Sequence, residues 1–462
     1  MIRTRDIALF IALLAGFLTP FDLSAVNIAL PSIGGEYAMD AIEMSWIATA
    51  YLLASGVFLL PFGRLADIYG RKKIFTTGLF IFSLASILMI FSVSSLMIIL
   101  VRVLQGFGGA MIFGTAVAIL SSVTPPCERG KVLGIYTTAV YLGLSTGPFF
   151  GGILTEYFGW RSIFLVNIPV GLFAVALILL FLKDEWADSR GEPFDTQGAI
   201  QYGLALVCVM YGFSLLPDIT GIILLIAGSA ILAWFILREL RIRYPLLDVS
   251  LFTANRVFAF SNLAALINYC ATFAVTFFLS LYLQYIKDFS PQQAGMLLVV
   301  QPVAQALFSP VAGRLSDRID PGKIASAGMG LTALGLVCLL LVDTATTIPE
   351  LILILIILGI GLGLFSSPNT NAIMGSVDKK RYGVASGTLG TMRIVGQMLS
   401  MGIAMMVLAI FIGDAQITPL LYPEFLDSMR ICFGISAVLC IAGIFFSLVR
   451  YTVIEGPGDR CA

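Results

Sequence analysis

Three charged side chains lie inside long apolar runs of the sequence: Asp22, Arg102 and Arg393. A charge near the centre of a lipid bilayer is costly unless it faces protein or water, so such residues point to functional sites. An aspartate beside an arginine can alternate between an ion pair and a protonated acid, depending on what occupies the arginine. These residues are therefore candidates for coupling proton movement to ligand binding.

Asp22 and Arg102 are predicted to lie at a similar depth. Asp22 is about 15 residues into the first run, roughly 22 Å from the start of that helix. Arg102 is about six residues into the fourth run, which crosses the other way, so it lies about 10 Å below the far surface. The chain has no histidine, so proton coupling must use carboxylates. The alternative is a purely structural ion pair.

Arg393 lies near the middle of its run, with Gln397 one turn further along. Polar groups on neighbouring helices, with an adaptable aromatic wall, predict a cargo cavity between two halves of the protein. For each glutamine taken alone, a helix-to-helix hydrogen bond is the favoured interpretation. Arginines outnumber Asp22 at depth, which favours neutral, monocationic or anionic cargo over dications. The other predicted cavity residues are Gln105, Tyr282, Gln301 and Gln305.

Long apolar helices must position these residues. The 462 residues are 59% hydrophobic and only 12% charged, with a mean hydropathy of +0.98, far outside the range of soluble domains. A bilayer core takes about 20 apolar residues per helix, so we predict an all-α integral membrane protein with fourteen spans. Their approximate limits are 7–33, 44–65, 74–94, 96–121, 132–155, 160–183, 196–216, 220–239, 257–286, 293–314, 324–343, 348–369, 382–411 and 428–452.

Basic residues gather in alternate loops, which predicts the orientation of the chain. Lys and Arg in short loops stay on the cytoplasmic side. Clusters such as Arg71 to Lys73 and Lys379 to Arg381 fall on one side when every run spans the membrane. We therefore expect a multi-pass protein of the cytoplasmic (inner) membrane with both termini in the cytoplasm.

Composition argues against several other classes of protein. The net charge is zero, so nucleic acid is not an expected partner. The seven cysteines include no C-x-x-C pair and there is no histidine, so we expect no metal site. The chain lacks a P-loop for an ATP-driven pump and any cluster of His, Cys or paired acids for a membrane enzyme. We expect no enzyme activity.

The segment Gly63 to Lys73 is repeated at Gly313 to Lys323. The copies follow the second and tenth predicted helices. Two six-helix bundles with pseudo-two-fold symmetry therefore fit if helices 7 and 8 form an inserted hairpin. The predicted units are residues 1–186, 187–247 and 248–462. Charges in these loops would hold the helix ends together as a cytoplasmic gate, and the alternative is a solvated loop. The gate candidates are Gly63, Asp67, Gly70, Arg71, Gly313 and Asp317.

The fifth run carries glycines four residues apart, at Gly143, Gly147 and Gly151. Small residues on one helix face let a neighbouring backbone approach closely, and Pro148 removes a backbone donor and bends the helix. Together with Gly152 they predict a helix that packs tightly and can flex. Ordinary small-residue packing is the alternative.

These motifs resemble the major facilitator superfamily, and within it the fourteen-helix drug:proton antiporter family, over essentially the whole chain. The loop Gly63 to Lys73 is similar to the superfamily signature between helices 2 and 3, and Arg102 to Gly106 to its helix 4 signature. Gly143 to Gly152 resembles the antiporter signature of helix 5. Further segments similar to the fourteen-helix branch are Asp22 to Pro31, Trp160 to Pro169, Pro245 to Asp248, Tyr282 to Gln284 and Ser290 to Gly295.

The resemblance implies a proton-coupled secondary transporter that exports small lipophilic or amphiphilic compounds by alternating access. It also implies that helix 5 limits leak during antiport. The expected partners are a small-molecule substrate, protons and the lipid bilayer, and we expect a monomer with no cofactor, driven by the proton gradient. The alternative is an exporter, uniporter or symporter of one specific metabolite without drug or proton coupling.

Overall fold

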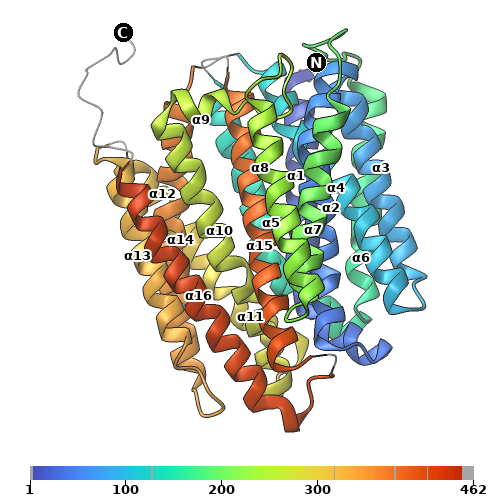
Figure 1. Ribbon diagram of the computed structural model, residues 1–462. Helices are drawn as coiled ribbons and strands as arrows, with labels where there is room; N and C mark the ends of the chain where they lie inside the picture. The colour runs from blue at the N-terminus through green and yellow to red at the C-terminus, as the bar shows by residue number, and fades with distance from the viewer. Residues whose placement is uncertain (1–3, 126–127, 317, 379–380, 414, 450–462) are drawn as a thin grey trace.

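The computed structural model describes residues 4–125, 128–316, 318–378, 381–413 and 415–449, and within these residues the chain is helical with no strand. The long helices stand side by side along one axis, and α1 starts at the same end of the molecule at which α16 finishes (Figure 1). Three residues singled out in the sequence, Asp317, Lys379 and Lys380, lie outside the described part. The elements are α1 (Thr4–Tyr37), α2 (Ala41–Tyr69), α3 (Arg71–Ile90), α4 (Ser95–Val123), α5 (Arg129–Phe158), α6 (Arg161–Phe181), α7 (Thr196–Ser214), α8 (Ile219–Glu239), α9 (Ser250–Ala254), α10 (Arg256–Leu281), the π-helical turn η1 (Tyr282–Ile286), α11 (Pro291–Leu298), α12 (Val300–Ser316), α13 (Pro321–Leu339), α14 (Ile348–Gly375), α15 (Tyr382–Phe411), the 3₁₀ turn η3 (Pro419–Leu421) and α16 (Tyr422–Val449).

Every predicted run overlaps one of these helices or two consecutive ones. Among the described residues, twelve helical segments are long and apolar enough to cross a membrane. Two further helices, α5 and α7, are not among them, and both carry many glycine and polar residues. The all-helical architecture is therefore as predicted. Fourteen spans, an inserted hairpin and the division into three units stay predictions.

Helices α1 to α6 pack as a first bundle. α1 lies along α5 and also contacts α4 and α6, while α4 packs on α2 and α3. The central part of α1 is accordingly buried on all sides, including Leu18, Ala25 and Val26. A side chain from this part of α1 can meet groups from several other helices.

Helices α10 to α16 pack as a second bundle. α10 contacts α14, α15 and α16, α13 packs between α14 and α16, and α12 lies along α14. The second bundle contacts the first mainly through α11, which packs on α5, and α15, which packs on α2, with smaller contacts of α10 with α1 and of α12 with α5. The boundary between the bundles therefore runs mainly along α2, α5, α11 and α15.

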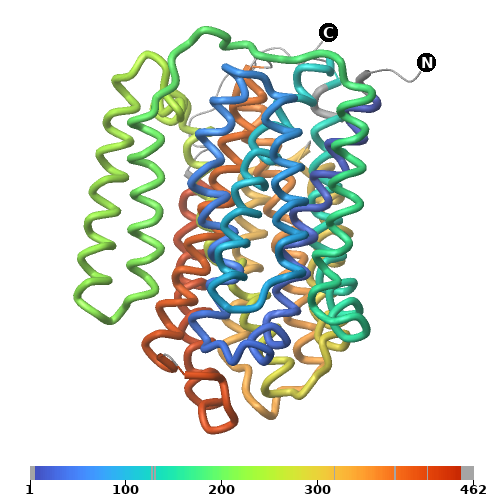
Figure 2. The backbone as a smooth tube through the Cα atoms, turned by 90° about the vertical axis from the view of Figure 1, so that its right-hand side faces the viewer, coloured from blue at the N-terminus to red at the C-terminus, as the bar shows by residue number. Residues whose placement is uncertain are grey.

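Helices α7 and α8 form a hairpin at the edge of the molecule (Figure 2). α7 contacts α2 of the first bundle and α15 of the second. At the base of the hairpin, Arg238 donates two hydrogen bonds to Asp195, at 2.6 and 2.8 Å. Burial acts to raise the pKa of Asp195, but hydrogen bonds from Arg238 and from the Gly198 amide outweigh it, so this pKa lies below its ordinary value. The charged carboxylate ties the start of α7 to the end of α8.

Candidate functional site

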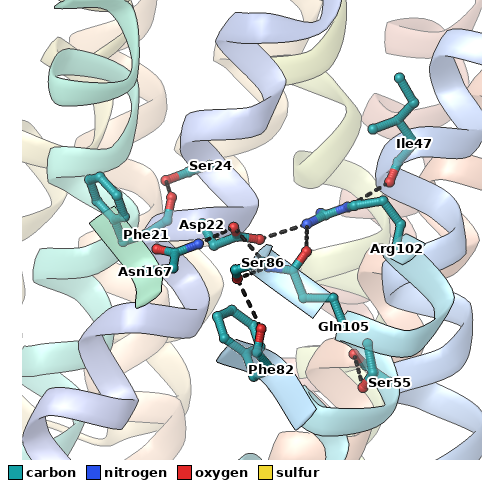
Figure 3. A network of polar contacts seen from close by, with 11 residues as sticks. Phe21, Asp22, Ser24, Ile47, Ser55, Phe82, Ser86, Arg102, Gln105 and Asn167 are labelled. Atoms are coloured by element: carbon teal, nitrogen blue, oxygen red, sulfur yellow. Dashed lines mark hydrogen bonds and ion pairs between the residues drawn. The ribbon is translucent and has the colours of Figure 1, made fainter. Parts of the chain in front are cut away.

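The carboxylate of Asp22 lies at the centre of a buried polar network in the first bundle (Figure 3). Arg102 Nη1 lies 2.6 Å from Asp22 Oδ2, and both side chains are 0% exposed. Asp22 Oδ1 accepts hydrogen bonds from Asn167 Nδ2 at 2.6 Å and from Gln105 Nε2 at 3.1 Å. The predicted shared depth of Asp22 and Arg102 is confirmed, whereas their role in proton coupling stays a prediction.

Arg102 is held by groups from several helices. Its Nε donates to the Ile47 carbonyl at 3.0 Å, and its Nη1 also donates to Gln105 Oε1 at 2.7 Å. The guanidinium lies over the Tyr51 ring, 4.6 Å from the ring centroid. Gln105 Nε2 in turn donates to Ser86 Oγ at 3.2 Å. The network thus joins α1, α2, α3, α4 and α6.

The surroundings of Asp22 suit a charged carboxylate. A buried ion pair is stable only when further hydrogen bonds satisfy its remaining polar atoms. Gln105 and Asn167 supply them for the carboxylate, whereas Arg102 Nη2 has no hydrogen-bond partner within the described chain. A proton on Asp22 would leave the Arg102 charge buried without a counter-ion, so the helices around it would have to rearrange. The Asp22–Arg102 pair therefore stabilises one packing of α1 against α4.

A cavity of about 870 Å³ lies between the two bundles. Its wall is built by α2, α4 and α5 on one side and by α10, α12, α14 and α15 on the other. It opens at the end of the molecule where α1 starts, since its mouth is lined by residues that join α2 to α3 and α6 to α7. The mouth residues include Arg64, Asp67, Arg71 and Asp188.

The two bundles touch at the end opposite the cavity mouth. Ser280 Oγ donates to the Asn27 carbonyl at 2.8 Å, and Gln284 Nε2 donates to the Ile28 carbonyl at 3.0 Å. Glu156 Oε2 accepts hydrogen bonds from Ser290 Oγ at 2.6 Å and from the Gln292 amide at 3.0 Å. These contacts hold that end together while the mouth is open.

Arg393 faces this cavity from α15. Its guanidinium lies over the Phe113 ring of α4, 5.6 Å from the ring centroid. Arg393 and Gln397 also line a small neighbouring cavity of about 20 Å³, together with Tyr51. The guanidinium of Arg102 lies over the same Tyr51 ring. One aromatic side chain therefore separates the surroundings of Arg393 from the buried network.

The predicted cavity residues divide into three groups. Gln305 and Arg393 line the large cavity, and Gln397 lines the small one. Gln105 belongs to the network of Asp22, not to the wall of either cavity. Gln301 is buried and lies outside the lining of both.

The placement of Tyr282 in the cavity wall is wrong. Its side chain is fully buried in η1, near the end of the molecule opposite the mouth, and its hydroxyl donates to the Asp343 carbonyl at 2.6 Å. Lys287 Nζ lies over its ring at 5.8 Å. Tyr282 therefore anchors the turn after α13 instead of facing cargo.

The loop between α2 and α3 carries the predicted charge cluster. Arg71 Nη2 lies 2.6 Å from Asp67 Oδ1 and 2.8 Å from Asp188 Oδ2, and Gly63 lies beside them in the cavity lining. Gly70 joins the two helices at φ +121°, which L side chains rarely adopt. The cluster is as predicted, but Asp188 is an additional partner from the segment joining α6 to α7.

That segment makes further contacts with the end of α2. Arg64 Nη1 donates to Ser189 Oγ at 3.2 Å, and Arg64 Nη2 lies 2.5 Å from Glu192 Oε2. In the second copy of the motif, Gly313 of α12 faces Ser367 of α14, and a Cβ atom on Gly313 would lie 2.9 Å from its Oγ. Asp317 lies outside the described residues, so a gating role for the second copy stays a prediction.

The glycines of α5 bring it against two other helices. A Cβ atom on Gly143, Gly147 or Gly151 would clash with the α1 backbone on either side of Asp22. A Cβ atom on Gly152 would lie 2.5 Å from the carbonyl oxygen of Pro291 at the start of α11, and the Pro148 carbonyl likewise touches Gly295. The predicted tight packing is confirmed, while a role in limiting leak stays a prediction.

Three members of the network were not predicted as site residues: Asn167, Ser86 and Tyr51. Asn167 had a usable signal, because it is an amide inside the apolar run of α6. Ser86 and Tyr51 had none, since serine and tyrosine are common in membrane helices and only packing shows which of them meet Gln105 and Arg102.

Comparisons with known proteins agree on one family. A family model described as Major Facilitator Superfamily matches residues 12–264 and again residues 261–460. The chain is 33% identical over 391 residues, 85% of each sequence, to Riboflavin transporter RibZ of Clostridioides difficile (strain 630). It is 29% identical over 423 residues, 89% of this chain and 78% of the relative, to Multidrug resistance protein Stp of Mycobacterium tuberculosis (strain CDC 1551 / Oshkosh). The crystal structure of a bacterial homologue of the human lysosomal transporter Spinster matches the fold with a TM-score of 0.66, at 17% identity over 97% of each chain. This chain, a multi-pass membrane protein, therefore belongs to the major facilitator superfamily of transporters.

Proposed function

We propose that this protein exports small lipophilic or amphiphilic compounds in exchange for protons, by alternating access. It acts in the cytoplasmic membrane as a monomer, with both termini and the cavity mouth on the cytoplasmic side, and needs no cofactor besides the proton gradient. The observation that carries the proposal is the Asp22–Arg102 pair, fully buried in the first bundle. Likeness to the multidrug resistance protein Stp supports export of drug-like cargo.

The proton acts through α1. A proton that binds Asp22 Oδ2 from the outer side displaces the hydrogen bond from Arg102 Nη1 and loosens α1 from α4. Asn27 and Ile28 follow Asp22 on the same helix, and their carbonyls hold the second bundle at the end opposite the mouth. Outward opening with bound cargo breaks these contacts. Protonation of Asp22 favours the return to the form in which they are made and the cavity is open to the cytoplasm, where the proton leaves and Asp22 pairs with Arg102 again.

A second candidate function is transport of one heteroaromatic metabolite. RibZ, whose name gives riboflavin as its cargo, is 33% identical and is matched over 85% of its length. The cavity of about 870 Å³ is large enough for a three-ring compound of this kind. Such a carrier would have the same fold as the proposed exporter but would transport one compound instead of many.

Transport by purified protein in liposomes tests both candidates. Rhodamine 6G, fluorescein and riboflavin are compared, with and without an imposed pH gradient, while a trapped pH dye reports proton movement. We expect gradient-driven transport of at least one of the two xanthene dyes with matching proton movement, and loss of both in Asp22→Asn. Asp218→Asn is the control, because Asp218 is an exposed acid at the start of α8 whose side chain caps nothing.

Each outcome separates the candidates. Transport that proceeds unchanged without a gradient, together with an active Asp22→Asn, rules out proton exchange. Transport of riboflavin but of neither dye favours the metabolite carrier.

A further inference from the structure

The charges that line the large cavity differ between its mouth and its interior. At the mouth, Arg71 pairs with Asp67 and Asp188, and Arg64 pairs with Glu192. Arg393 lies 11 residues into α15, about 16 Å further along the helix axis. Among the described residues it has no ion-pair partner, and the described acids of the lining, Asp67, Asp188 and Asp248, all belong to the mouth.

An arginine without a counter-ion in a membrane-embedded cavity is costly, and a bound anion removes that cost. Its guanidinium presents a planar set of donors that matches a carboxylate or phenolate in two parallel hydrogen bonds. A cationic ligand at the same depth would meet repulsion and no compensating acid. The interior of the cavity therefore favours a negative group on the cargo.

The rest of the interior is aromatic. Phe113 lies beneath Arg393, and Tyr141 of α5 and Tyr269 of α10 approach each other across the bundle boundary, with their hydroxyl oxygens 3.4 Å apart. Tyr136 also lines the cavity and is 6% exposed, and its hydroxyl has no hydrogen-bond partner within the described chain. Flat aromatic ligands stack on such walls.

We propose that the cargo is an aromatic organic anion, whose negative group binds Arg393 and whose rings lie among Phe113, Tyr136, Tyr141 and Tyr269. The proposal rests on the proposed function in taking this cavity as the cargo site. It narrows the cargo from lipophilic compounds in general to planar aromatics that carry a carboxylate or an equivalent acidic group.

Two dyes with one ring system and opposite charge provide the test. Fluorescein is anionic and rhodamine 6G is cationic, and both share the xanthene rings. Binding to the purified full-length protein is followed by fluorescence anisotropy for the wild type, Arg393→Gln, Arg393→Lys and the control Arg241→Gln. Arg241 is an exposed arginine outside the cavity lining.

We expect the wild type to bind fluorescein more tightly than rhodamine 6G. Arg393→Gln should weaken fluorescein binding at least about tenfold, the loss typical for a hydrogen bond to a charged group. Rhodamine 6G binding should stay unchanged or improve, which also shows that the variant is folded. Arg393→Lys should retain part of the preference, and Arg241→Gln all of it.

Three results overturn the proposal: preference of the wild type for rhodamine 6G, no binding of fluorescein, or an equal loss of both dyes in Arg393→Gln. The proposed function fails separately. Fluorescein binding that depends on Arg393, without proton-driven transport, supports the cargo class and contradicts proton exchange. Proton-driven transport that Arg393→Gln leaves unchanged supports proton exchange and contradicts the cargo class.

Discussion

The two bundles treat their buried charge in opposite ways. In the first bundle, Arg102 is fully enclosed and pairs with Asp22, with amides completing the network. In the second, Arg393 faces a cavity, lies over the Phe113 ring and interacts with Tyr269, and it has no ion-pair partner among the described residues. Arg102 has a counter-ion within the protein, and this ion pair stabilises one packing of the helices. Arg393 has none among the described residues, so its charge selects which ligands bind in the cavity. Under the proposed function and cargo class, the first bundle carries the proton-binding acid and the second the arginine that meets the charge of the cargo, while both line the cavity.

Removing each arginine is the strongest test of this contrast. Arg102→Met leaves Asp22 buried without its partner, so we expect it to lower the free energy of unfolding by about 3–5 kcal/mol. Arg393→Met removes no ion pair, so its effect should stay within about 0.5 kcal/mol. Unfolding in a single detergent, followed by tryptophan fluorescence, measures both. Equal losses would mean that Arg393 is as structural as Arg102.

Amide side chains extend the comparison at a smaller scale. Asn167→Leu removes a donor to a buried carboxylate, and we expect a loss of about 1.5–3 kcal/mol in unfolding free energy. Asn371→Leu, in the cavity wall, removes an exposed hydrogen bond to Ser316 and should change stability by less than about 0.5 kcal/mol. The same unfolding assay measures both variants. An Asn167→Leu variant as stable as the wild type would show that Asp22 does not need all three of its hydrogen-bond donors.

Glycine contacts on α1 test whether the network needs close packing around it. Gly147→Ala places a methyl group against the α1 backbone beside Asp22, and overpacking of this kind costs about 1–3 kcal/mol. Gly330→Ala in α13 is the matched control, because its Cβ would meet only Ile444 Cδ1 at 3.9 Å. We expect only the first variant to lose stability and proton-driven transport. Equal stability and equal transport of the two variants would show that close packing of α5 against α1 is not required.

The smallest effect is expected at the cavity mouth. Asp188 is 71% exposed where it pairs with Arg71, and exposed ion pairs contribute at most about 1 kcal/mol. Asp188→Asn should therefore lower the unfolding free energy by less than that, and added salt should abolish the difference between variant and wild type. A salt-independent loss as large as that of Arg102→Met would place the mouth, not the network, at the centre of stability.

Depth along a helix was predictable from the sequence, whereas lateral position was not. The fixed rise per residue placed Asp22 and Arg102 at one level, and the structure joins them. Side-chain type alone put Gln301, Gln305 and Tyr282 in one cavity wall, although of these three only Gln305 lines it. Where a cavity ends depends on how two bundles pack, and the sequence of a single helix does not contain that information.

Loop contacts were likewise beyond the reach of sequence patterns. The motif at Asp67 and Arg71 was visible as charges at a helix end, but its partner Asp188 lies in an irregular segment without periodicity. The glycine spacing of α5 succeeded for the opposite reason, because residues four apart share one helix face whatever the partner helix is.

The hairpin of α7 and α8 touches both bundles, through contacts in which one partner is a glycine. Gly203 of α7 faces Val57 of α2, and Gly402 of α15 faces Phe213 of α7. At these two points a glycine stands in place of a side chain, so each bundle approaches α7 closely and can shift there without meeting a second side chain. Bulkier residues at these two glycines should therefore slow the transport cycle while leaving the affinity for cargo unchanged.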